Sequence, residues 1–218
     1  MPTALIIGAS RGLGLGLVRE LAGRGWSVTG TVRAAADRAA VEAAGGTAAV
    51  ADITDAASIT ALPEAPLDLL FVNAGVSGSA HQDAGRATAD EVSALFLTNA
   101  LAPVAAARAL LDRIADGGVL AFMTSRMGSV ADNSSGDMEL YRASKAALNS
   151  LTRSLQAKLG RPLTVLSLHP GWVRTAMGGD SAPLDVATSA RGLVDTILAH
   201  RGTPGSAFFD YSGAELPW

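Results

Sequence analysis

Short, continuously apolar segments alternate with longer helix-like segments along this chain of 218 residues. The segments expected to form strands are residues 3–7, 26–32, 47–51, 67–72, 118–124, 163–168 and 207–209. Strands that lack an alternating polar face are typical of a parallel sheet buried on both sides. The repeated strand–helix order therefore predicts a doubly wound α/β sheet of about seven mostly parallel strands, with helices on both faces.

The segments between these strands have helical spacing. In residues 12–23, for example, Leu13, Leu17 and Leu21 recur every four residues. The other expected helices are residues 34–44, 55–62, 89–115, 141–159 and 185–200. No linker interrupts them, so we expect residues 1–218 to form a single domain. Loops around 126–140 and 172–185 follow strand ends, where ligand pockets of such sheets are lined.

Composition narrows the classes of function. A net charge of −3 gives no basic surface for nucleic acid. The absence of cysteine excludes disulfides and thiolate metal sites, and we expect no metal. No apolar stretch is expected to reach membrane-spanning length, and the start MPTALIIGAS lacks the basic region of a signal peptide. We therefore expect a cytoplasmic protein that binds neither nucleic acid nor membrane.

A glycine-rich turn, Gly8-Ala-Ser-Arg-Gly12-Leu-Gly14, joins the first strand to the first helix. Glycines there allow a tight bend and the close approach of a pyrophosphate, which the free N–H groups of the helix start would bind. Arg33 directly follows the second strand, and Arg11 lies in the turn itself. A guanidinium suits a ribose 2′-phosphate, whereas an acidic residue would suit the 2′-hydroxyl of NAD. The pattern predicts NADP(H) as the cofactor. The alternative is that Arg11 and Arg33 are ordinary surface residues of an arginine-rich chain.

Tyr141 and Lys145 form the sharpest chemical signal. Four residues apart on a helix, they share one face. An ammonium beside a phenol favours phenolate, so we expect Lys145 to lower the pKa of Tyr141 and make it a general acid or base. A second hydroxyl should orient the substrate oxygen. Ser125 follows the fifth strand and is the leading candidate, with Thr124 and Ser129 as rivals.

Taken together, these residues resemble the short-chain dehydrogenase/reductase family, whose fold is of the Rossmann type. The resemblance covers nearly the whole chain. It rests on seven features that occur in order: the Gly8–Gly14 turn, Asp52, Asn73-Ala74-Gly75, Asn99, Ser125, the Tyr141/Lys145 pair and Pro170-Gly171-Trp172-Val173-Arg174-Thr175.

The resemblance implies a role for each position. Tyr141 would be the acid/base, Ser125 the orienting donor, and Asn99 would hold a water that links Lys145 to solvent. Lys145 would also bind the nicotinamide ribose. The residues implied in cofactor binding are Gly8, Ser10, Arg11, Gly12, Leu13, Gly14, Arg33, Asp52, Ile53, Asn73, Ala74, Gly75, Tyr141, Lys145, Pro170, Gly171, Val173 and Thr175.

Within the family, the segments SRMGSVADN and YRASKAALN and the ending FFDYSGAELPW resemble a short subgroup of C-signal-like and carbonyl reductase-like members. The implied activity is reversible, NADPH-dependent reduction of an aldehyde or ketone. The alternative is a dinucleotide-binding sensor or signalling protein on the same fold. The interval from Ser125 to Tyr141 is sixteen residues, longer than is usual in the family, which alters the mouth of the pocket.

The expected partners are a small carbonyl or alcohol substrate and further copies of the chain, as a homodimer or homotetramer. The Ala-rich segments 105–107 and 146–147 permit close helix contact, either between copies or against the sheet. Met127, Met138, Trp172 and Met177 could line an apolar substrate pocket, or each could belong to the core.

Overall fold

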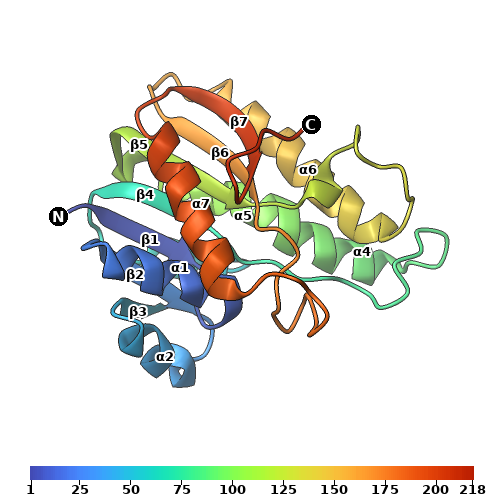
Figure 1. The fold of residues 1–218 in the computed structure, drawn as a ribbon, viewed down its shortest axis with the longest axis horizontal. Helices are drawn as coiled ribbons and strands as arrows, with labels where there is room; N and C mark the ends of the chain where they lie inside the picture. The colour runs from blue at the N-terminus through green and yellow to red at the C-terminus, as the bar shows by residue number, and fades with distance from the viewer.

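The computed structural model describes all residues from 1 to 218 and contains one seven-stranded sheet in the order β3-β2-β1-β4-β5-β6-β7 (Figure 1). Every neighbouring pair of strands is parallel, so the expected sheet is confirmed and has no antiparallel edge. The strands are β1 (Thr3–Ile7), β2 (Ser27–Val32), β3 (Thr47–Val50), β4 (Leu67–Val72), β5 (Ile114–Met123), β6 (Thr164–His169) and β7 (Gly205–Asp210).

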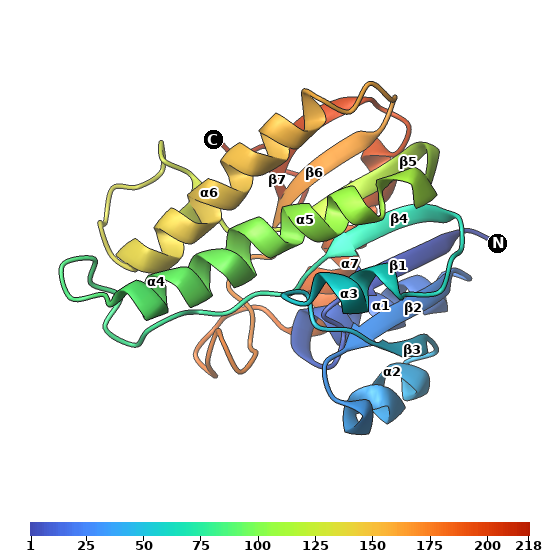
Figure 2. The same cartoon turned by 180° about the vertical axis from the view of Figure 1, so that it is seen from behind.

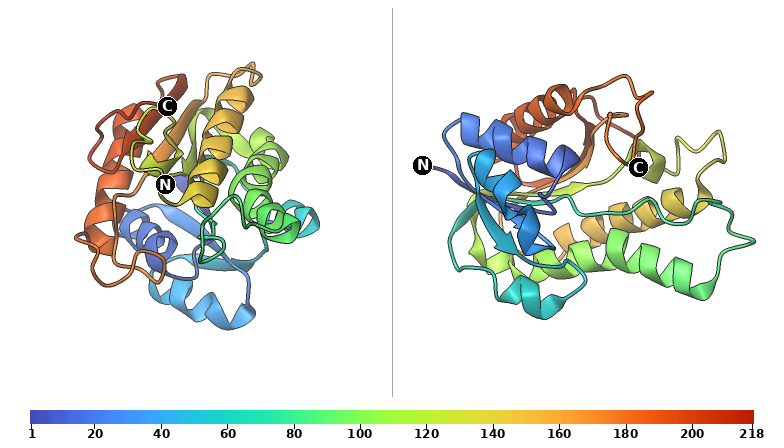
Figure 3. Two further views of the ribbon diagram at one scale, coloured as in Figure 1. Left: turned by 90° about the vertical axis from the view of Figure 1, so that its right-hand side faces the viewer. Right: turned by 90° about the horizontal axis from the view of Figure 1, so that it is seen from below.

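Helices cover both faces of the sheet. Helices α1 (Gly12–Gly23), α2 (Arg38–Ala43) and α7 (Val186–His200) pack into one core cluster. Helices α3 (Ala56–Thr60), α5 (Ala102–Ala109) and α6 (Glu139–Gln156) pack into the other. Figure 2 shows the second layer from behind, with α4 (Ala89–Phe96) continuing the line of α5. The views in Figure 3 show the sheet between the two layers.

The strands divide their side chains between the two layers. In β1, Ala4 and Ile6 belong to one core cluster, while Leu5 and Ile7 belong to the other. Successive side chains of a strand point to opposite faces, so a strand with helices on both sides must be apolar throughout. This is the physical reason why continuous apolar runs were sufficient to predict the strands.

The order of the strands creates a switch point at the centre of the sheet. The chain winds outward from β1 through β2 to β3, then crosses back to place β4 on the other side of β1. The connections after β1 and β4 therefore leave the sheet on opposite faces. A crevice opens between them at the carboxyl ends of the strands, where ligands of doubly wound sheets bind.

The expected helix over residues 89–115 is wrong in its length and its regularity. Helix α4 ends at Phe96, a π-helical segment covers Leu97–Leu101, and α5 ends at Ala109. Pro103 has no N–H to donate to the carbonyl of Asn99 four residues earlier, which accounts for the wider turn there. Strand β5 begins at Ile114, four residues before the expected start at residue 118. A β-bulge in its pairing with β4 lets residues 114–117 join the strand.

The helical stretch Ala89–Ala109 also corrects the expectation that no segment reaches membrane-spanning length. Its length and composition alone would allow it to cross a membrane, and 44% of its apolar window is buried inside the protein. Its buried members, among them Ala102, Val104 and Ala107, pack against the sheet in the second core cluster. These residues account for the buried part of the stretch.

Candidate functional site

A cleft of about 690 Å³ lies at the switch point, a volume suited to a bound small molecule. It is formed where the turns after β1, β2, β3, β4 and β6 meet the end of β5 and one side of α6. Its lining residues are Ile7, Gly8, Ser10, Arg11, Gly12, Leu13, Thr31, Val32, Arg33, Ala51, Asp52, Ile53, Thr54, Asn73, Ala74, Gly75, Val76, Thr98, Met123, Thr124, Tyr141, Lys145, Pro170, Arg174, Thr175, Ala176 and Met177.

The glycine turn is a cradle that has no room for a side chain at Gly8 or Gly14. Gly8 has a φ of 90°, and a Cβ there would lie 2.9 Å from the backbone of Ala74. A Cβ on Gly14 would lie 2.0 Å from the carbonyl oxygen of Gly8. Asn73 fixes that same oxygen by donating a hydrogen bond to it from Nδ2 at 2.6 Å. Gly8 and Gly12 of the turn therefore present bare backbone to the cleft, which suits the close approach of a pyrophosphate.

Helix α1 begins at this cradle without a local cap. Its N-cap residue, Arg11, makes no side-chain hydrogen bond to the helix, and the first turn contains no acidic residue. The first N–H groups of a helix have no partner within the helix and carry partial positive charge. These groups are available to an anion in the cleft, as the sequence predicted.

Two arginines make one end of the cleft positive. The side chains of Arg11 and Arg33 are both exposed, line the cleft, and form no hydrogen bond or ion pair within the chain. Asp52 lies beside them, and its Oδ1 accepts hydrogen bonds from the N–H and hydroxyl of Thr54. Those bonds, with a smaller contribution from the charge of Arg33, hold the pKa of Asp52 below its usual value. The free cations at this end can therefore bind an added phosphate.

Helix α6 brings Tyr141 and Lys145 to the other end of the cleft. Lys145 Nζ lies 5.7 Å from the centroid of the Tyr141 ring and donates to the carbonyl oxygen of Met123 at 3.0 Å. Lys145 is only 3% exposed, and burial lowers its pKa to about 8. The structure thus confirms the juxtaposition that the four-residue spacing predicted.

The expected lowering of the Tyr141 pKa is wrong for the protein without ligand. Burial raises the pKa of Tyr141 to about 12, and the nearby Ser125 hydroxyl only partly opposes that rise. Removing water from a phenol disfavours its charged form, and this effect is the main cause of the rise. Tyr141 is therefore held protonated at neutral pH, the form that can donate a proton.

Asn99 is fully buried in the π-helical segment and joins three parts of the site. Its Oδ1 accepts from the N–H of Val76, and its Nδ2 donates to the Val76 carbonyl and to Ser144 Oγ. A Cβ on Gly75 would lie 3.3 Å from Asn99 Oδ1 and 3.4 Å from Lys145 Nζ. The absence of a side chain at Gly75 therefore leaves Asn99 and Lys145 close to each other. The water that would link them remains a prediction.

The three hydroxyls proposed as substrate donors have different surroundings. Ser125 caps the short 3₁₀ segment Arg126–Gly128, where its Oγ accepts from the N–H of Met127 at 3.2 Å. Ser129 donates to the carbonyl of Trp218, so its hydroxyl is already engaged. The buried Oγ1 of Thr124 has no partner and Thr124 lines the cleft. Ser125 and Thr124 thus remain as donors, and Ser125 is the one close enough to affect the phenol.

Three of the residues expected to bind the cofactor do not line the cleft. Gly14 lies beneath the turn, against Gly8 and Asn73. Val173 is buried and forms a β-bridge with Leu184, while a Cβ on Gly171 would lie 2.4 Å from the Leu184 side chain. Val173 and Gly171 instead shape the segment that leads through the loop at 172–185. Pro170 and Thr175 of the same segment do line the cleft.

Some cleft residues had no sequence signal. Thr31 near the end of β2, Thr98 in the π-helical segment and Met123 at the end of β5 all line it. Of the four residues named for an apolar pocket, Met177 lines the cleft and is 53% exposed. Trp172 is 56% exposed outside it, and Met127 and Met138 are half-buried elsewhere. The alanines also divide, because Ala106 and Ala107 pack on the sheet while Ala105 faces solvent.

Fold and site together define a dinucleotide-binding α/β protein with a Tyr–Lys pair at its cleft. Residues 2–183 match the family model for short chain dehydrogenases. The chain therefore belongs to the short-chain dehydrogenase/reductase family.

Relatives of known name agree with this assignment. The chain is 44% identical to the C-signal protein of Myxococcus xanthus over 160 residues, covering 70% of this chain and 93% of that protein. A carbonyl reductase of Pseudomonas aeruginosa, solved in complex with NADP, is 46% identical with a TM-score of 0.91 and full coverage of both chains. A short-chain dehydrogenase/reductase of Burkholderia multivorans with bound NADP is 40% identical, with a TM-score of 0.95 over 100% of this chain and 99% of that one.

Proposed function

We propose that the chain reduces a small aldehyde or ketone with NADPH, and that Tyr141 donates the proton. The observation that carries the proposal is the cleft itself, with Arg11 and Arg33 at one end and Tyr141 and Lys145 at the other. The solved relatives with bound NADP support the choice of nucleotide. The name carbonyl reductase, given to the Pseudomonas aeruginosa relative, supports the class of substrate.

Each part of the cleft has a task in this reaction. The glycine cradle and the start of α1 would bind the pyrophosphate, and Arg11 and Arg33 the 2′-phosphate. When bound, NADPH supplies the hydride that reduces the carbonyl carbon. Ser125 would orient the carbonyl oxygen, and Tyr141 would protonate it.

The states of Tyr141 and Lys145 bear on the direction of reduction. Tyr141 carries its proton at neutral pH, as a donor must, although burial raises its pKa to about 12 and so weakens it as an acid. Lys145, with a pKa of about 8, is mainly charged at neutral pH. Its positive charge would stabilise the phenolate that forms once the proton has left.

A signalling role is the second candidate, because the Myxococcus xanthus relative carries the name C-signal. A sensor requires the nucleotide cradle but has no use for a buried Tyr–Lys pair. The presence of Tyr141 beside Lys145 in the same cleft favours the enzyme. We also propose a homodimer or homotetramer, supported by the exposed Leu97 and Leu101 on the outer side of the π-helical segment.

The direct test is turnover. The purified chain is assayed for oxidation of NADPH and of NADH against a panel of aldehydes and ketones. We expect turnover of at least one carbonyl, faster with NADPH than with NADH at equal concentration. Binding of NADPH without turnover of any carbonyl would favour the sensor.

A further inference from the structure

The loop between β4 and α4 contains a buried glutamine whose amide group is fully bonded. Gln82 is 9% exposed and has a left-handed backbone with φ 53°. Its Nε2 donates to the carbonyl oxygens of Ser77 and Ser79, both at 2.7 Å, and its Oε1 accepts from the N–H of Tyr141 at 2.9 Å. A left-handed backbone is unfavourable for a residue with a Cβ, so the surrounding contacts must hold it in place.

The bond to Tyr141 replaces a cap that α6 lacks. The N-cap position of α6 is occupied by Met138, which is left-handed and makes no capping hydrogen bond. Tyr141 is the third residue of the helix, and its N–H has no carbonyl partner within the helix. A nearby Ser, Thr, Asp or Asn normally accepts from this N–H. Here the acceptor comes from Gln82, 59 residues earlier in the chain.

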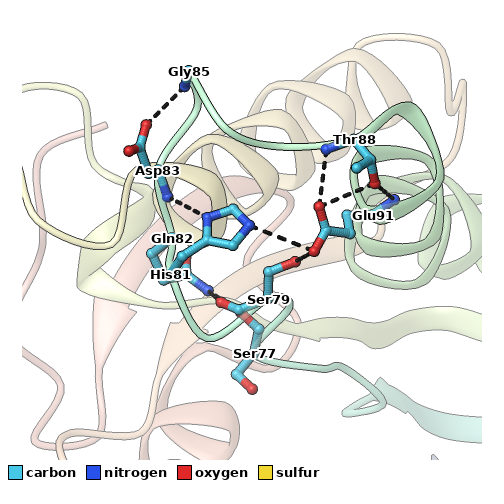
Figure 4. A network of polar contacts seen from close by, with 8 residues as sticks. All are labelled: Ser77, Ser79, His81, Gln82, Asp83, Gly85, Thr88 and Glu91. Carbon is cyan, nitrogen blue, oxygen red and sulfur yellow. Dashed lines mark hydrogen bonds and ion pairs between the residues drawn. The ribbon is translucent and has the colours of Figure 1, made fainter.

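Residues 77–88 are called the 77–88 loop. Besides the contacts of Gln82, this loop is hydrogen-bonded to the starts of α4 and α6, and it extends beyond them in Figure 2. Ser79 Oγ donates to Glu91 Oε1 at 2.6 Å, and His81 Nε2 lies 3.5 Å from the same oxygen (Figure 4). Glu91 also forms a reciprocal capping box with Thr88 at the start of α4. On α6, Glu139 accepts from the N–H of Ala84 at 2.8 Å.

The 77–88 loop also continues directly from the cleft. Val76, which precedes it, lines the cleft and is bonded through both backbone groups to Asn99. The loop therefore connects two fixed points of the site. One is the cleft wall at Val76, and the other is the backbone of Tyr141, whose side chain lines the same cleft.

We propose that Gln82 is a positioning residue for Tyr141. Its hydrogen bond to the Tyr141 N–H fixes the first turn of α6, and with it the place of the phenol in the cleft. The effect on catalysis rests on the proposed function. The protection of the Tyr141 amide by Gln82 does not depend on any activity, so the two are tested separately.

Amide hydrogen exchange, measured by NMR at single residues, tests the hydrogen bond. In the wild-type protein, the Tyr141 amide should exchange more slowly than that of Leu140, the preceding residue, which also lies before the first intrahelical bond. In Gln82→Met, which keeps the length of the side chain, exchange at Tyr141 should be about tenfold faster, the effect of losing one hydrogen bond. Ser79→Ala is the control, because it keeps the backbone carbonyl that Gln82 uses. Equal exchange at Tyr141 and Leu140 in the wild type, or no change in Gln82→Met, would overturn the proposal.

Kinetics test the positioning role. Gln82→Met should lower kcat about tenfold, while the Kd for NADPH stays within twofold of the wild type. Gln156→Ala, which removes a glutamine side chain that forms no hydrogen bond at the far end of α6, should change neither. An unchanged kcat would contradict the proposal, as would a loss of NADPH affinity equal to the loss in kcat. If the wild type reduces no carbonyl, the proposed function fails, and the exchange experiment still decides the role of Gln82.

Discussion

Two hollows of similar size lie at opposite edges of the sheet. The cleft at the carboxyl edge has a volume of about 690 Å³, and a second hollow at the amino edge has about 600 Å³. The amino-edge hollow is lined by two arginines and the cleft by three, of which Arg174 already donates to the carbonyls of Ala182 and Pro183. At the carboxyl edge, Arg11 and Arg33 are free. At the amino edge, Arg113 and Arg161 donate to the carbonyls of the connections around them, including those of Leu62 and Leu111.

The difference shows that volume does not identify a binding site. The guanidinium groups of the amino edge already have acceptors, so they stabilise the connections between elements and have little left to offer a ligand. The carboxyl edge instead keeps free cations, uncapped helix N–H groups and an unpartnered Thr124 hydroxyl. A buried polar group without a partner, such as the Thr124 hydroxyl, is unfavourable to maintain in a folded protein and is expected where a ligand completes it.

The largest expected effect comes from removing the proposed acid. Tyr141→Phe should lower kcat by roughly 10²- to 10⁴-fold, the range for general acid–base catalysis, with the Kd for NADPH nearly unchanged. The control is Tyr211→Phe, since the chain's other tyrosine packs against Gly171 and Gly192 outside the cleft. It should retain wild-type kcat. Equal kcat values for Tyr141→Phe and the wild type would remove Tyr141 from the mechanism.

Filling the glycine cradle should disturb the carboxyl edge more than a matched change elsewhere. Gly14→Ala places a Cβ 2.0 Å from the Gly8 carbonyl, so the free energy of unfolding should fall by roughly 3 kcal/mol and NADPH binding should weaken. Gly23→Ala at the end of the same helix meets nothing within 4 Å and should leave stability unchanged or slightly higher. Chemical denaturation of both variants measures this. Equal stabilities would mean that the cradle can relax.

The free energy of unfolding should also depend on pH through His169, which ends β6 at the carboxyl edge of the sheet. Burial, with a smaller effect of the Arg126 charge, lowers the pKa of His169 from 6.5 to about 4, and its Nδ1 is buried without a partner. Folding thus favours the neutral imidazole, so its contribution is complete above pH 6.5 and is lost as the pH falls toward 4.

The shift corresponds to a loss of stability on the order of 3 kcal/mol across that interval. His169→Gln cannot ionise there and should flatten the decline. Unfolding by denaturant at a series of pH values gives both curves. Parallel curves for the two proteins would show that His169 is not the group responsible.

The smallest expected effects compare the arginines of the two hollows. Arg33→Ala should weaken NADPH binding about tenfold, because one charge-assisted hydrogen bond is lost, and leave NADH binding unchanged. Arg161→Ala should leave both nucleotides unaffected and lower the free energy of unfolding by about 1–2 kcal/mol, since two backbone carbonyls lose a donor. If Arg161→Ala weakened NADPH binding instead, the distinction between the hollows would be wrong.

The sequence predicted most of the fold because its strands are buried on both faces. A buried strand must be continuously apolar, and residues 67–72, for example, were assigned correctly for that reason. The expected helix 89–115 was too long and too regular. Pro103 is a local signal for an irregular turn at Asn99, whereas the bulge at the start of β5 depends on the pairing of β5 with β4 and has no local pattern.

The candidate site divides in the same way. The Tyr141/Lys145 pair and the glycine turn were predicted because their members lie close together in the chain. Gln82 was not, because its bond to Tyr141 joins residues 59 positions apart. The pKa of Tyr141 was predicted in the wrong direction because spacing gives the distance to Lys145 but says nothing of burial.

The central claim is that the carboxyl-edge cleft binds NADPH with its 2′-phosphate on Arg11 and Arg33. A fluorescence titration of the purified protein with NADPH and with NADH tests it most directly. We expect saturable binding of NADPH and at least about tenfold weaker binding of NADH, because NADH lacks the phosphate that both arginines would contact. Equal affinity for the two nucleotides would contradict the assignment of the arginines, and no binding of either would contradict the whole account of the cleft.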